Sequence, residues 1–63
     1  MFNIRTELPS GAISRGYDRT TVESAEFTFT RVVSQCKAMK DYVIDVVMTD
    51  DGVELQREHI ENA

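Results

Sequence analysis

The chain has few of the residues that build catalytic or metal centres. It contains one cysteine, one histidine, one proline and no tryptophan in 63 residues. A lone cysteine excludes a disulfide within the chain, and Cys36 with His59 cannot complete the four-ligand cage of a structural zinc site. We therefore expect no metal and no cofactor. We also expect that the protein is not an enzyme, because no nucleophile and base form a recognisable motif.

Long apolar runs are missing as well. No stretch approaches the roughly 20 apolar residues that span a bilayer, and the first residues lack the basic start of a signal peptide. Together with the unpaired Cys36, this predicts a cytoplasmic protein without a membrane partner. We expect residues 1–63 to form a single domain. A domain of this size buries only about 60% of its unfolded surface, so a second subunit is a plausible aid to stability.

Charge is distributed unevenly along the chain. The net charge of −4 lies entirely in the second half, because residues 1–31 carry as many basic as acidic side chains. An acidic field repels nucleic acid and favours a basic partner. The acidic residues of the second half either mimic nucleic-acid phosphates or form a solvated surface, and we favour the solvated surface. They are Asp41, Asp45, Asp50, Asp51, Glu54, Glu58 and Glu61.

Two strands are expected before the helix. Apolar and polar residues alternate over 2–8, which is the pattern of a half-buried strand. The turn residues 9–11 follow, and a weaker strand is expected from Ala12 to about Tyr17, with Gly16 marking a bulge or an edge. These two segments predict a hairpin.

A helix is expected from about residue 22 to 39. Thr20 and Glu23 have the spacing of a capping box. Apolar residues then recur every three or four positions, which predicts one buried stripe. Residues 26–32 also alternate as a strand would, but this pattern is shorter, so we favour the helix. The stripe consists of Val22, Ala25, Phe29, Val32, Cys36 and Met39.

The third strand, residues 42–49, is the strongest strand signal in the chain. Residues 50–52 predict a hairpin turn and a last strand from Val53 to about Arg57, with 58–63 expected to be a frayed tail. The resulting ββαββ order predicts an α+β fold. Its four strands would form an antiparallel sheet in the order 2-1-3-4, with the helix on one face.

One helix covers only one face of such a sheet. Val43 and Val47 would lie on the opposite, bare face beside Asp45, and Phe27 falls off the apolar stripe of the helix. Exposed apolar patches usually mark interaction sites. The sequence therefore predicts a protein-binding module that forms a homodimer through this face, with Val43, Val47, Asp45 and Phe27 as partner-binding residues.

An alternative function is a nucleic-acid-binding or regulatory module. Arg15 and Arg19 flank Tyr17 in the sequence, Arg5 and Arg15 could share a face of the sheet, and a tyrosine ring can stack on a base. The net negative charge makes this the less favoured hypothesis.

The layout resembles the short accessory proteins that bacteriophages and prophages encode. The resemblance depends on residues 8–11 of the first hairpin, 22–26 at the start of the helix and 48–52 at the last turn. It implies a binder, often an inhibitor, directed at a host or defence protein whose identity the sequence leaves open.

Overall fold

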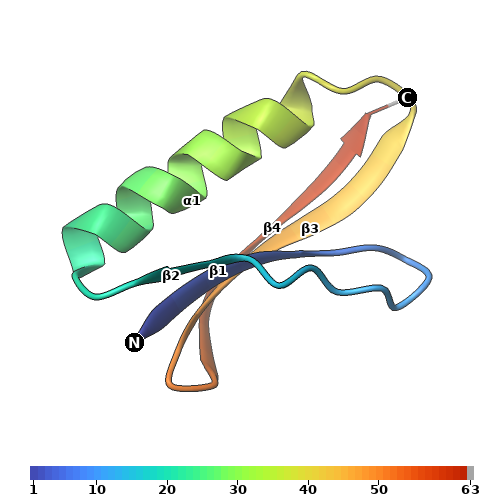
Figure 1. Cartoon of the computed structure of the whole chain (residues 1–63). Coiled ribbons are helices and arrows are strands. Elements are labelled where there is room, and N and C mark those ends of the chain that lie inside the picture. Colours follow the sequence, from blue (N-terminus) through green and yellow to red (C-terminus); the bar gives the residue numbers. More distant parts are fainter. Residues whose placement is uncertain (63) are drawn as a thin grey trace.

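The computed structural model describes residues 1–62 as one four-stranded sheet with a helix packed on one face (Figure 1). The elements in chain order are β1 (Phe2–Glu7), β2 (Tyr17–Arg19), α1 (Val22–Lys37), β3 (Tyr42–Asp50) and β4 (Val53–Asn62). Every strand pair is antiparallel, and the strand order is β2-β1-β3-β4. The predicted α+β class and strand order are therefore confirmed.

The N-cap residue of α1 lies one position later than predicted. The side chain of Thr21, not of Thr20, accepts the hydrogen bond from the Ser24 amide, and Thr21 has the extended backbone of an N-cap. Residues 26–32 are helical, so the alternating pattern does not form a strand. Because the helical stripe extends over more turns, its burial outweighs the local strand preference.

The core lies between α1 and the sheet. It is built from the helical stripe and the inward-facing residues of β1, β3 and β4. The ends of the predicted stripe lie outside it, because Val22 and Met39 are about half exposed. Its members are Ile4, Ala25, Phe29, Val32, Cys36, Ile44, Val46, Met48 and Ile60.

Strand β2 is shorter than predicted and lies further along the chain. It starts at Tyr17, and the residues before it contact β1 only irregularly, for example through an isolated bridge between Ile13 and Glu7 and hydrogen bonds between Ser14 and Thr6. Gly16 explains the break. Its φ is +77°, and a Cβ there would lie 2.3 Å from the carbonyl oxygen of Ile4. Only glycine fits this positive φ and close approach.

Strand β4 is longer than predicted. The expected tail at 58–63 is instead paired with β3 as far as Asn62, and residue 63 lies outside the described residues. Ile60 is buried in the core opposite Ile44. The Asn62 side chain donates to the carbonyl oxygens of Cys36 and Met39, at 3.0 and 2.6 Å, and so ties β4 to the end of the helix.

The face of the sheet opposite α1, here called the outer face, is not bare. Val47 has no exposed surface, which corrects the prediction that it lies open, while Val43 is 36% exposed. Arg5 of β1 and Arg57 of β4 pair directly with Val47. Long charged side chains cover apolar surface with their stems. We attribute the burial of Val47 to these two arginines.

Among residues 1–62, the structure contains no helix that is long and apolar enough to cross a membrane.

Candidate functional site

The predicted partner-binding residues do not form one surface. Val43, Asp45 and Val47 lie on the outer face, whereas Phe27 projects from α1 on the other side of the sheet. Phe27 is 68% exposed. The placement of these residues therefore removes the bare apolar face from which a dimer through Val43 and Val47 was inferred.

Ion pairs cover the outer face instead. Arg57 contacts Asp45, Glu54 and Glu7 at 2.6, 2.8 and 3.2 Å, and Arg5 contacts Glu7 at 3.1 Å. The Arg57 guanidinium lowers the pKa of Glu54, and these carboxylates raise the pKa of Arg57 in turn. Two acidic residues of the second half of the chain, Asp45 and Glu54, are thus paired internally on this face.

His59 extends this network along β4. Its Nδ1 lies 2.6 Å from the Asp45 carboxylate, and its Nε2 lies 3.5 Å from Glu61. The two carboxylates raise the pKa of His59. His59 and then Arg57 lower the pKa of Asp45. No serine, threonine or cysteine side chain is bonded to this histidine within residues 1–62, so the geometry is that of an ion pair and not of a nucleophile with its base.

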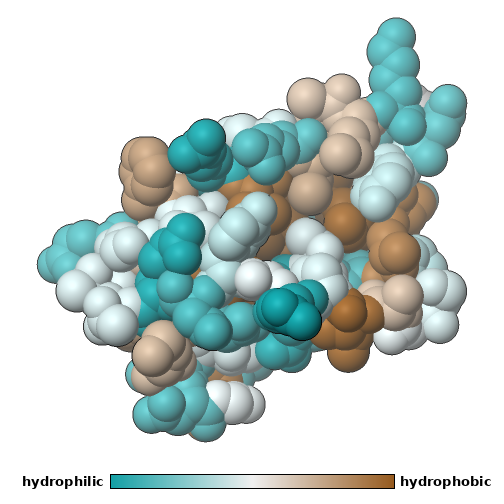
Figure 2. Space-filling view, viewed as in Figure 1, coloured by the Kyte–Doolittle hydropathy of each residue, from teal (hydrophilic) through white to brown (hydrophobic). Residues whose placement is uncertain are grey.

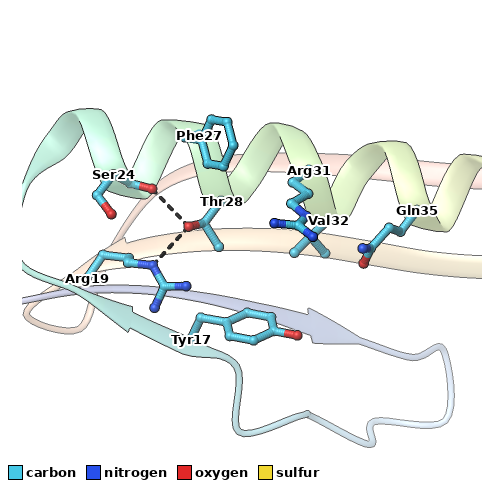
Figure 3. Close-up of a pocket in the computed structure, with 8 residues that line it drawn as sticks. All are labelled: Tyr17, Arg19, Ser24, Phe27, Thr28, Arg31, Val32 and Gln35. Atoms are coloured by element: carbon cyan, nitrogen blue, oxygen red, sulfur yellow. Dashed lines mark hydrogen bonds between the residues drawn. The ribbon is translucent and has the colours of Figure 1, made fainter.

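A hollow lies between α1 and β2, on the side of the sheet that the helix covers (Figure 3). It has a volume of about 460 Å³. Because β2 has only three residues, the sheet does not reach far beneath this side of the helix. The hollow is lined by Tyr17, Arg19, Ser24, Phe27, Thr28, Arg31, Val32 and Gln35.

Arg19 is held firmly at this hollow. Its Nε donates to the Thr28 hydroxyl at 3.0 Å, and Thr28 in turn donates to the Ser24 carbonyl oxygen at 2.9 Å. Nη1 of Arg19 donates to its neighbour's backbone, the Asp18 carbonyl, and its guanidinium carbon lies 5.4 Å from the centre of the Tyr17 ring. Figure 3 shows the hydrogen bonds that link Arg19, Thr28 and Ser24. Together these contacts hold the guanidinium group of Arg19 in place without a ligand.

Arg31 supplies a second positive charge from the helix. It is exposed and lies one turn after Phe27. Within residues 1–62, neither Arg31 nor Arg19 forms an ion pair with a carboxylate. The positive charge of this region is therefore available to a ligand, although the whole chain is acidic.

A second hollow continues the first toward the end of the helix. The two share Tyr17, Val32 and Gln35, so we treat them as one feature, the α1–β2 groove. The second part has a volume of about 400 Å³. Figure 2 shows apolar surface in this gap between helix and strands. Its apolar and aromatic lining includes Ile4, Val32, Cys36, Met39, Tyr42 and Ile44, and polar residues, among them Arg5, Thr6, Ser14 and Gln35, line it as well.

Cys36 lies in the apolar part of the groove as a buried free thiol. Burial raises the pKa of this thiol, so it remains protonated and weakly nucleophilic. Its position agrees with a packing role.

The arginines of the alternative hypothesis are separated by the sheet. Arg5 lies on the outer face and pairs with Glu7, whereas Arg19 and Tyr17 face the helix. Arg15 lies in the loop before β2. Arg31, which was not among the predicted residues, lies with Arg19 in the lining of the groove instead. A second helical stripe could have identified it, because Ser24, Phe27, Thr28, Arg31 and Gln35 recur at helical spacing.

Comparison with protein-family models, with curated proteins and with solved structures finds no match. The resemblance to bacteriophage accessory proteins stays a prediction.

Proposed function

We propose that the protein is a non-enzymatic protein-binding module whose α1–β2 groove receives an acidic, partly apolar segment of its partner. The observation that carries this proposal is the pair of arginines, Arg19 and Arg31, that line one groove without a carboxylate partner in residues 1–62. Charge-assisted hydrogen bonds from guanidinium groups to carboxylates are among the strongest polar contacts in proteins.

The shape and composition of the groove support a segment with two kinds of side chain. Carboxylates would bind near Arg19 and Arg31, next to the exposed ring of Phe27. Apolar side chains would enter the continuation near Met39 and Tyr42. Aromatic residues and arginine are the residue types that dominate binding energies at protein interfaces.

This proposal changes the expected chemistry of the partner. The uneven charge of the sequence favoured a basic partner, but two carboxylates of the second half, those of Asp45 and Glu54, are paired on the outer face. Arg19 and Arg31, which have no carboxylate partner in residues 1–62, lie in the groove on the other side of the sheet. The local charge at the groove therefore favours an acidic segment. A cytoplasmic location remains part of the proposal, supported by the unpaired Cys36.

Synthetic peptides test the proposal. Peptides that alternate Asp or Glu with Leu or Phe should bind, whereas the same peptides with Asn and Gln should not. Replacing Arg31 with Glu should weaken binding at least about tenfold, since a lost charge-assisted hydrogen bond costs about 1.5–3 kcal/mol. The matched control is Lys40→Glu, which makes the same charge change at an exposed position outside the groove. Because solvent and salt screen distant charges, its effect should be much smaller.

Two outcomes would overturn the proposal. One is equal binding of acidic and amide peptides, and the other is an equal effect of Arg31→Glu and Lys40→Glu. A single-stranded oligonucleotide serves as the competing probe. If it bound with steep salt dependence while the peptides did not, the groove would be a nucleic-acid site.

A further inference from the structure

The edge strand β4 is the longest strand of the sheet and has only one neighbour. It extends over ten residues, from Val53 to Asn62, and pairs only with β3. An edge strand presents a row of unpaired backbone N–H and C=O groups to any other strand. Edges are often protected by proline or lysine, and β4 contains neither. Its protection is limited to charged side chains of both signs and one irregularity.

That irregularity defines the segment that can pair. The register between β3 and β4 shifts between Met48 and Thr49, which leaves Leu55 as the extra residue of a β-bulge. From Gln56 to Asn62 the pairing is regular. A bulge interrupts the ladder and bends the strand. The regular seven-residue segment is therefore the part of β4 that can add another strand, and His59 is at its centre.

We propose that β4 joins a second copy of this chain, antiparallel, about a twofold axis at His59. In this register Arg57 faces Glu61 of the second copy, and Glu61 faces Arg57 of the second copy. Both residues lie on the outer face, and directly opposed charges of opposite sign stabilise a strand pair. Gln56 would face Asn62, and Glu58 would face Ile60.

The neighbouring registers fit less well. An axis at Arg57 or at Glu58 would place two arginines or two glutamates directly opposite each other, which destabilises a strand pair. The axis at His59 places two imidazoles opposite each other, and each of them is paired with the Asp45 carboxylate of its own chain at 2.6 Å. An axis at Ile60 would leave Gln56 and Arg57 without partners among residues 56–62. Only the axis at His59 pairs the whole regular segment and also opposes Arg57 to Glu61. The charge pattern of β4 is thus complementary to itself.

This edge dimer does not depend on the proposed function. Strands β4 and β2 are at opposite edges of the sheet, so dimerisation would leave the α1–β2 groove of each copy open. The dimer also differs from the dimer expected from the sequence, because its contact is the edge of the sheet and not the outer face. Arg31→Glu should leave it unchanged.

Cross-linking tests the register directly. In this arrangement the two copies of residue 59 face each other, so His59→Cys should form a disulfide-linked dimer under mild oxidation. The matched control is Glu58→Cys, whose counterpart in the second copy is Ile60, and it should cross-link poorly. Buried Cys36 is present in both variants, so its contribution is the same. Equal cross-linking of the two variants would overturn the proposed register.

Light scattering tests the association itself. The wild-type chain should have twice the mass of the 7.2 kDa monomer, and Glu61→Arg should weaken the dimer at least about tenfold. The Glu61 side chain is 71% exposed, and among the charged groups of residues 1–62 it contacts only His59, so this variant should remain folded by circular dichroism. A wild-type mass of 7.2 kDa at every concentration up to about 1 mM would overturn the proposal.

Discussion

Arg57 and Arg31 carry the same charge but have different surroundings. Arg57 contacts three carboxylates on the outer face, whereas Arg31 has no carboxylate partner among residues 1–62. The sequence indicates the charge of each residue but not its partners, because Arg57 pairs with Glu7 from the other end of the chain. The composition therefore indicates an acidic protein, but it does not indicate that one groove of this protein carries positive charge.

His59 provides a pH-dependent prediction at this scale. Its contact with Asp45 stabilises the fold when the carboxyl is ionised and the imidazole is protonated. The pKa of Asp45 is lowered from 3.8, so the contribution of Asp45 to the stability of the fold is present above pH 3.8 and is lost as pH falls through the lowered pKa. The pKa of His59 is raised from 6.5, so its contribution is complete below pH 6.5 and is lost as pH rises through the raised pKa.

The His59→Gln variant should therefore be less stable than the wild type mainly between pH 3.8 and 6.5. At about pH 9 the two should unfold at nearly the same temperature. Thermal unfolding at about 5 µM, where association contributes least, measures this difference. If the difference in unfolding temperature between the two proteins were the same from acid to alkaline pH, the result would contradict the ion pair. The effect should be small because the imidazole is exposed.

At the scale of the element, the helix shows what local sequence can determine. Its stripe, its capping region and its approximate length follow from residues close in sequence, and all were predicted within a few positions. The sequence did not predict whether Thr20 or Thr21 is the N-cap. Both residues have the same hydroxyl group, and they differ only in backbone geometry. Likewise, β2 was misplaced because Gly16 is constrained by the distant Ile4 carbonyl.

Replacing each threonine tests the assignment of the cap. Thr21→Ala should lower the free energy of unfolding by about 0.5–2 kcal/mol, because the Ser24 amide loses its acceptor. Thr20→Ala removes the same hydroxyl one position earlier and should change stability by less than about 0.5 kcal/mol. Urea unfolding measures both. If Thr20→Ala had the larger effect, the capping box predicted from Thr20 and Glu23 would be correct instead.

At the scale of the whole molecule, both ends of the chain are integral to one small core. Strand β1 lies in the interior of the sheet, and β4 contributes Ile60 from residues that the sequence analysis assigned to a frayed tail. That assignment was wrong because Ile60 is surrounded by charged residues in sequence but lies opposite Ile44 in the sheet. Its apolar partner comes from another strand and is invisible to local patterns.

Ile60→Ala should therefore destabilise the whole domain. Removing a buried isoleucine side chain to alanine typically costs about 2–5 kcal/mol, which is a large share of a total of about 5–15 kcal/mol. Leu55→Ala is the matched control in the same strand, because Leu55 is 52% exposed whereas Ile60 is 3% exposed. The urea concentrations at the midpoint of unfolding of the two variants measure this difference. Similar small effects would mean that residues 58–62 are peripheral to the fold.

The sequence by itself determined the kind of elements and their order. Helical and alternating patterns are local, and the short ββαββ chain allows few ways to arrange an antiparallel sheet. Only the tertiary structure decided which surfaces are free. Val47 is buried between Arg5 and Arg57 of the two neighbouring strands, and Arg19 of β2 and Arg31 of α1 line the same groove. Exposure and charge pairing depend on contacts between distant residues, which no local pattern contains.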